Sequence, residues 1–238
     1  MRSATILAFA VIALVGFQDP VSVDPKIASV VFENDRVRVL RVHTGPHERF
    51  ETHSHPAVLV VSLTDSSRRA YLPDGTHRDS NVALGDVHWR EPSTHAVENL
   101  LDTPYENIEI EFKNAKEPAV AVRTVPTPAV SSESSTAVPV EQEPLHHTVL
   151  QNQYARVLDV TIPPGQSTLF HTHEHDNLSI RVSDGLVQTQ VQGKDWLPPS
   201  RLERGSIVFS NGSNQHYTHR VKNAGTSPYH VIDVELLP

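Results

Sequence analysis

Residues 170–177 read FHTHEHDN and place three histidines on alternate positions of one short run. In an extended strand, alternate side chains point to the same face, so His171 and His173 would lie about 6–7 Å apart along one face. Two imidazoles at that spacing can bind one metal ion. The stretch therefore predicts a β-strand that carries half of a metal site.

The same stretch has a counterpart earlier in the chain. A shift of 118 residues places His53 on His171 and His55 on His173, and it aligns NDRVRVLRV (residues 34–42) with NQYARVLDV (residues 152–160). Further on, HAVEN (95–99) matches HRVKN (219–223). Because the landmarks recur in the same order, the chain is predicted to be an internal duplication.

Between the copies lies a segment rich in proline and serine, residues 115–145. Proline removes hydrogen-bond donors from a β-ladder, and the segment has no sustained apolar period, so it is expected to be a semi-extended linker. The expected organisation is a signal peptide (1–19), a first domain (26–114), the linker and a second domain (146–238).

Each copy alternates apolar and polar residues and ends its runs at Gly, Pro or Asp-Ser turns, with no helical stripe. Many short strands of this kind predict an all-β sandwich or barrel, such as a jelly roll.

The second copy reads Gly165, five residues, then His171-Thr172-His173, and a downstream H-x3-N follows. This pattern resembles the two motifs of the cupin superfamily, and both halves carry it, so the chain resembles a bicupin. The resemblance implies two tandem jelly-roll β-barrels, each with a divalent metal ion inside. Carried over residue by residue, it implies these metal ligands: His53, His55 and His95 in one barrel, and His171, His173 and His219 in the other.

Two departures from the cupin motifs affect the site. Neither copy has the motif glutamate after H-x-H, since the positions hold Val58 or Leu59 and Asn177 or Leu178. Each centre is therefore expected to have three histidines and open positions.

The third ligand of the second copy is ambiguous. Counting from Gly205 along the motif leads to His216, whereas the repeat and the H-x3-N spacing favour His219, which we choose.

Imidazole ligands are compatible with Fe, Zn, Mn, Ni or Cu. A metal-dependent oxidoreductase of dioxygenase type, acting on a small organic substrate, is one hypothesis, and a non-catalytic protein that binds a small molecule or a metal is the other; an isomerase is a weaker third. Glu174, His175 and His216 are candidate general bases, and no catalytic residue is assigned. Five further histidines are expected to be surface residues: His43, His47, His77, His146 and His147.

The net charge of −8 and the absence of clustered Lys and Arg argue against nucleic acid as a partner. The apolar run from Ala4 to Phe17 is about 14 residues long, too short for a membrane span, and follows Arg2. It predicts a signal peptide cut near residues 16–19, and hence a secreted or periplasmic protein with no membrane span after cleavage. A homodimer through strand edges is a further possibility.

Overall fold

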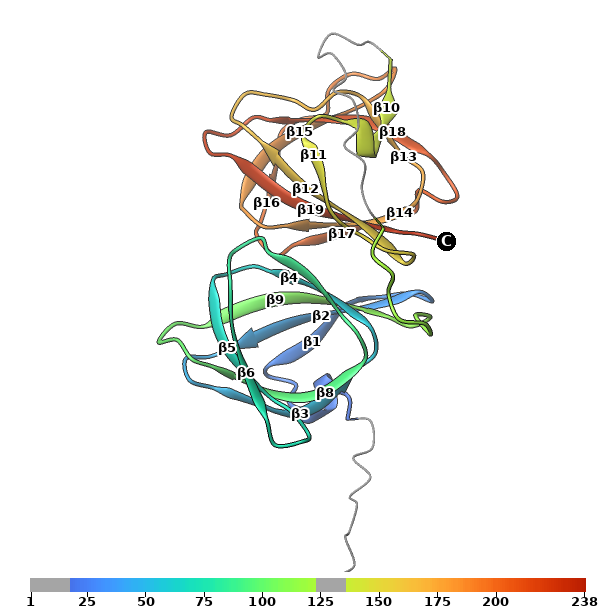
Figure 1. Cartoon of the computed structure of the whole chain (residues 1–238). Coiled ribbons are helices and arrows are strands. Elements are labelled where there is room, and N and C mark those ends of the chain that lie inside the picture. The colour runs from blue at the N-terminus through green and yellow to red at the C-terminus, as the bar shows by residue number, and fades with distance from the viewer. Residues whose placement is uncertain (1–17, 123–135) are drawn as a thin grey trace, which may run out of the picture.

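The computed structural model describes residues 18–122 and 136–238, and the regular secondary structure in these ranges is nearly all β-strand, with mainly antiparallel pairing. Two β-barrels lie one on the other (Figure 1). The prediction of two jelly-roll barrels in an all-β chain is thus confirmed. The predicted signal peptide lies outside the described residues except for Gln18 and Asp19.

The first barrel consists of a five-stranded sheet with the order β1-β2-β9-β4-β7 and a four-stranded sheet with the order β3-β8-β5-β6. Its elements are α1 (Pro20–Val23), β1 (Ala28–Glu33), β2 (Val37–Thr44), β3 (Arg49–His55), β4 (Val58–Ser62), β5 (Ser66–Tyr71), β6 (His77–Val82), β7 (Val87–Arg90), β8 (Ser93–Asn99) and β9 (Tyr105–Phe112).

The second barrel repeats this plan with the orders β11-β12-β19-β14-β17 and β10-β13-β18-β15-β16. Its elements are β10 (Val138–Pro139), η1 (Val140–Gln142), β11 (His146–Gln151), β12 (Ala155–Ile162), β13 (His171–His173), β14 (Asp176–Arg181), β15 (Gly185–Val191), β16 (Ser200–Leu202), β17 (Ile207–Ser210), β18 (Tyr217–Asn223) and β19 (Tyr229–Leu236).

The duplication is visible in the burial of equivalent strands as well as in their order. β2 and β12 show the same sequence of buried and exposed positions, and so do β9 and β19. The same pattern of side chains therefore builds the same barrel twice.

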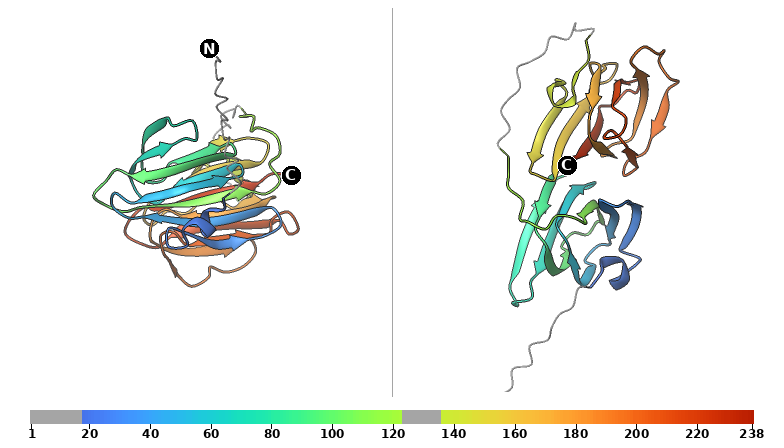
Figure 2. Two further views of the ribbon diagram at one scale, coloured as in Figure 1. Left: turned by 90° about the horizontal axis from the view of Figure 1, so that it is seen from below. Right: turned by 90° about the vertical axis from the view of Figure 1, so that its right-hand side faces the viewer.

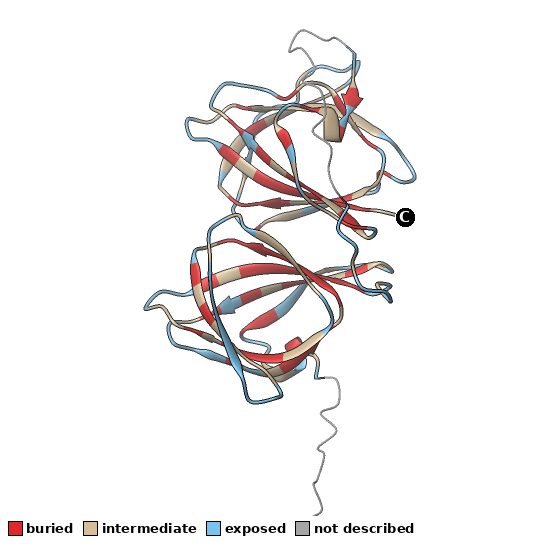
Figure 3. Ribbon diagram, in the orientation of Figure 1, coloured by how far each residue is buried: buried red, intermediate tan, exposed pale blue. Residues whose placement is uncertain are grey.

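The sheet β1-β2-β9-β4-β7 of the first barrel faces the sheet β11-β12-β19-β14-β17 of the second, and the two share one apolar core (Figures 2 and 3). Ile108 and Ile110 of β9 belong to the same buried cluster as Ile232 and Val234 of β19. Aromatic rings add to this contact, with Trp89 stacked on Tyr154 at 5.7 Å between ring centroids. The two barrels are therefore joined by apolar packing rather than held only by the segment between them.

Because these two sheets pack face to face, the side chains on their other faces lie inside the barrels. Side chains alternate across a strand, so the neighbours of Ile108 and Ile110 point away from the shared core. Those neighbours are Asn107, Glu109 and Glu111, all buried. The apolar face of β9 thus packs between the barrels, and its polar face lines the first barrel.

Residues on both sides of the expected domain limits pack on the barrels. Gln18 accepts a hydrogen bond from the Ser54 amide at 2.8 Å, and Asp19 caps α1 and pairs with Arg38 at 2.5 Å. Near the end of the expected linker, β10 pairs in parallel with β13, and Glu143 is buried. The structure therefore attaches residues 18–25 to the first barrel and residues 138–145 to the second.

Among the described residues, none of the helical segments has the length and hydropathy that a membrane crossing requires.

Candidate metal centres

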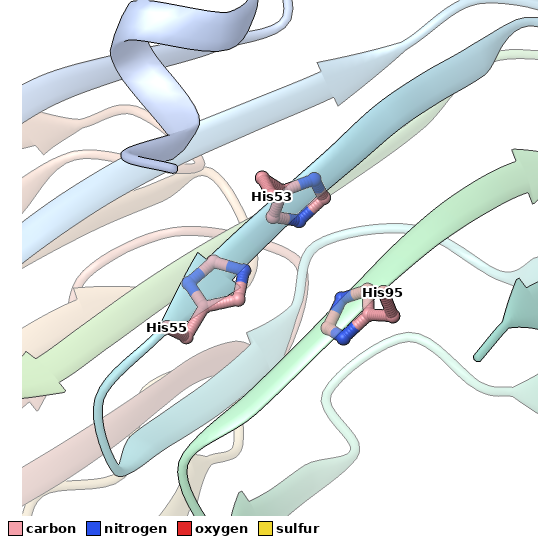
Figure 4. Close-up of side chains that lie close together, drawn as sticks. All are labelled: His53, His55 and His95. Carbon is pink, nitrogen blue, oxygen red and sulfur yellow. The ribbon is translucent and has the colours of Figure 1, made fainter. Parts of the chain in front are cut away.

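The first three-histidine cluster spans two neighbouring strands of the four-stranded sheet. His53 and His55 alternate on β3, and His53 is directly opposite His95 on β8. All three side chains point toward one another (Figure 4), and one ring nitrogen from each lies within 4.8 Å of the others. They are only 2–4% exposed, so they converge in the barrel interior.

The second cluster has the same construction. His171 and His173 alternate on β13, and His171 is opposite His219 on β18. The Nε2 atoms of His171 and His219 are 3.0 Å apart. His216 is exposed and lies outside the cluster, so the structure places His219, as the repeat register indicated, beside the pair.

The backbone fixes the orientation of one histidine in each cluster. The Nδ1 atom of His53 bonds the carbonyl of Glu51 at 2.7 Å, and that of His171 bonds the carbonyl of Leu169 at 3.0 Å. A carbonyl only accepts, so Nδ1 carries the proton and Nε2 keeps its lone pair for the cluster. This is the tautomer that a metal ligand requires.

Burial keeps these histidines neutral. It is the main cause that lowers the pKa of His171 well below the usual value, since the low-polarity interior disfavours an imidazolium. The same cause lowers the pKa of further cluster members, to about 4 for His53 and His173, about 3 for His219 and about 2 for His95. At neutral pH these rings therefore have lone pairs available.

Buried carboxylates also border both clusters, although neither has one at the position where the cupin motif places it. In the first barrel Glu111 Oε1 lies 3.0 Å from His55 Nδ1, and Glu109 Oε2 lies 3.6 Å from His55 Nε2. In the second, Glu235 Oε1 lies 4.0 Å from His173 Nδ1. These groups come from the last strand of each barrel, which neither sequence motif connects with the sites. The alternation IEIEF in residues 108–112 places both glutamates on one face of the strand, but it does not indicate that this face is the inner one.

His146 corrects a sequence-based expectation. It was expected on the surface, yet it is buried, and its ring centroid lies 4.5 Å from that of His171. Its Nδ1 bonds Glu143 Oε2 at 2.5 Å, and its Nε2 is 3.9 Å from Asp233 Oδ2. The 118-residue shift aligns His146 with Ala28, which is also buried, so this position is buried in both barrels. The other four histidines of that group are exposed as expected: His43, His47, His77 and His147.

A cavity of about 570 Å³ adjoins the second cluster. All three histidines line it together with His146 and Asp233, and apolar side chains such as Val187 and Tyr229 complete the wall. The three candidate bases named from the sequence do not line it: Glu174, His175 and His216. The volume suits a small organic molecule.

Comparisons with known proteins place this geometry in a known fold. No protein-family model and no curated protein matches the sequence. Among solved structures, AerE from Microcystis aeruginosa is similar along 89% of this chain and 98% of its own, with 16% identity and a TM-score of 0.60. A single-residue variant of oxalate decarboxylase from Bacillus subtilis is similar along 88% of this chain and 72% of its own, with 13% identity and a TM-score of 0.56. A cupin domain from Bordetella pertussis matches 37% of this chain and 92% of its own, with 30% identity and a TM-score of 0.35.

The fold is that of a bicupin. The two barrels of this chain differ in how well their clusters suit a divalent cation. In the second, the Nε2 atoms of His171 and His219 lie 3.0 Å apart, and His173 Nδ1 and Glu235 Oε1 are buried without a hydrogen-bond partner, as His55 Nε2 and Glu109 Oε2 are in the first. A lone-pair cluster with unsatisfied neighbours fits a divalent ion.

In the first barrel a cation is already present. Arg90 Nη1 lies 3.2 Å from His95 Nε2, and Arg90 Nη2 lies 3.3 Å from Glu109 Oε1. A guanidinium only donates, so His95 Nε2 accepts and its lone pair is used. The first cluster therefore fits a metal ion less well than the second.

Proposed function

We propose that this bicupin binds one divalent metal ion at His171, His173 and His219 and acts as an oxidoreductase of dioxygenase type on a small organic substrate. The observation that carries the proposal is the convergence of three neutral histidines, the buried His171 and His173 and the half-buried His219, on the wall of a cavity. Oxalate decarboxylase from Bacillus subtilis, which has a similar fold, has Mn(II) centres, and this supports a metal in a barrel of this type.

Bound there, an iron, manganese or copper ion would supply Lewis-acid polarisation and one-electron chemistry. A dioxygenase places both atoms of O2 in the substrate, which itself provides the electrons, so the reaction needs no external reductant. The chain contributes the enclosure and the polar contacts. Asp233 and His146 line the wall beside the cluster, and Val187 and Tyr229 contribute apolar surface to the rest of it.

The alternative is a protein that binds a small molecule or a metal without turnover. The cavity favours a bound organic molecule in either case, and the polar groups beside the cluster favour chemistry on it. Oxygen uptake separates the two, because a binding protein does not consume O2.

We also propose that the protein is exported and acts in the periplasm or outside the cell. The apolar run that ends at Phe17 supports this proposal, and so does the barrel's use of Gln18 and Asp19, since cleavage before Gln18 leaves both contacts in place.

The test starts with protein reconstituted separately with Fe²⁺, Mn²⁺, Cu²⁺ and Zn²⁺ under argon. Metal content is measured by elemental analysis, and O2 uptake is then recorded with a panel of small phenols, diols and enolisable ketones. Wild-type protein should bind metal and consume O2 with at least one substrate class, and His171→Ala should do neither. Metal binding that His171→Ala leaves unchanged would refute the site. A loaded protein that binds panel compounds and consumes no O2 would support the non-catalytic alternative.

A further inference from the structure

The two barrels place different residues at the same positions around their histidines. Strand pairing sets the equivalence, because Arg90 is opposite Val58, which is opposite Glu111, and Ser210 is opposite Asn177, which is opposite Glu235. Arg90 of the first barrel therefore corresponds to Ser210 of the second.

A second arginine shows the same relation. Arg68 on β5 is opposite Asn99, and Val187 on β15 is opposite Asn223, so Arg68 corresponds to Val187. Arg68 is only 8% exposed. Both Val187 and Ser210 line the cavity of the second barrel. Two guanidinium side chains thus occupy the first barrel where small residues border open volume in the second.

We propose that the Arg90 guanidinium takes the place of the metal cation in the first barrel, so that the chain binds a single divalent ion, in the second barrel. The inference rests on the proposed function for the location of that ion. The sequence motif alone predicts two ions, because it contains the histidines and gives no information about the side chains that contact them from other strands.

Arg90 bonds two of the groups that a metal ion in the first cluster would need. Its Nη1 occupies the lone pair of His95, and its Nη2 pairs with Glu109, the carboxylate beside His55. A dication at the cluster would lie a few ångströms from a permanent positive charge in a buried site, where repulsion is poorly screened. Moving Arg90 away would also break its bond to Glu109, which is only 5% exposed.

The second barrel lacks this arrangement. Its one cavity-lining arginine, Arg181, donates from Nη1 to the Ser179 carbonyl at 2.7 Å. Among the interactions of the described residues, none joins Arg181 to the three histidines. Arg156 pairs with Glu235 Oε2 at 2.7 Å, but among the described contacts it has no hydrogen bond to a ring nitrogen of the three histidines, so their lone pairs are free of a guanidinium donor.

The decisive experiment counts metal ions in the whole chain with Co²⁺ as the probe. Apo protein is equilibrated with Co²⁺, desalted and examined by elemental analysis and by visible absorption, which reports nitrogen ligation directly. Wild type should bind about one ion per chain, His53→Ala should keep it and His171→Ala should lose it. Arg90→Ser, which copies the second barrel, should bind about two, and Arg90→Ser combined with His95→Ala should return to one. Arg78→Ser, at an exposed arginine on β6, is the matched control and should stay at one.

Two results would overturn the inference. One is a wild-type content of two ions that falls to one in His53→Ala, a comparison that does not depend on the folding of any Arg90 variant. The other is an Arg90→Ser protein with native circular dichroism that still binds one ion. If wild type binds none and Arg90→Ser binds one that His53→Ala removes, the role of Arg90 stands and the proposed function fails.

Discussion

Replacing His88 with valine should make the protein less sensitive to acid. His88 lies on β7, opposite Val60, and Val208 takes the same place in the second barrel. Burial is the main cause that lowers its pKa to about 4, and the positive charges of Arg90 and Arg68 add to this. Valine at this position is therefore compatible with the fold and removes one histidine that folding keeps neutral.

The size of the effect follows from proton linkage. In the unfolded chain a histidine has a pKa near 6.5, so between pH 7.5 and pH 5.5 it takes up most of a proton, whereas folded His88 takes up almost none. Because the unfolded state binds more protons, stability falls as the pH falls below 6.5. Integration over this interval gives a loss of about 1.3 kcal/mol from His88 alone. The difference in unfolding free energy between His88→Val and wild type should shift by that amount in favour of the variant.

Urea unfolding at 25 °C in the presence of EDTA measures this shift. A Trp196→Phe background leaves Trp89, beside His88, as the single tryptophan, so fluorescence reports on the first barrel. The free-energy difference between variant and wild type should be constant from pH 8.5 to pH 7.5, where neither state takes up a proton at His88, and this provides the control. An equal difference at pH 7.5 and pH 5.5 would refute the account, because it would mean that folding leaves the titration of His88 unchanged.

Three further outcomes are expected. Trp89→Ala should lower the unfolding free energy by about 2 kcal/mol in urea titrations, because the half-buried ring packs on Phe112 and Tyr154 between the barrels, and an unchanged midpoint would contradict that role. Glu143→Gln should lower the unfolding free energy by about 1–3 kcal/mol in the same assay, because it weakens the buried hydrogen bond between this carboxylate and His146. The Co²⁺ content should stay unchanged, because His146 is not one of the three proposed ligands. N-terminal sequencing of the exported protein should begin at or before Gln18, and a start after Asp19 would show that the contacts of these two residues are dispensable.

The sequence predicted the parts of this structure that depend on local spacing. Period-two alternation gave the strands, the 118-residue repeat gave the two barrels, and the repeat register selected His219 over His216. Each of these depends on the order of residues along one strand or on two copies of the same pattern. Both kinds of information are contained in the chain itself.

The surroundings of the histidines depend on packing between distant strands, and there the sequence was insufficient. Residues 108–112 and 231–236 have the pattern of apolar closing strands, although their carboxylates face the barrel interiors. Nothing in the alternation says which face is inside, because the apolar face is covered by the other barrel. The prediction that His146 lies on the surface is wrong for a related reason. The sequence places this residue at the junction between the linker and the second domain, whereas in the structure it is the first residue of β11 and is buried.

The shared core gives the first barrel a structural role that does not depend on metal binding. Ile232, Val234 and Leu236 of the second barrel are buried against a cluster that includes Ile108 and Ile110 of the first. Without the first barrel this apolar sheet face would meet water, at a cost of about 25 cal/mol for each Å² exposed. The first barrel is therefore needed even with Arg68 and Arg90 among its histidines and strands, because it covers the sheet that carries Asp233 and Glu235 into the second site. In the proposed arrangement the duplication would provide one chemical centre and one structural support, and the residues that distinguish them are the few that differ inside two otherwise equivalent barrels.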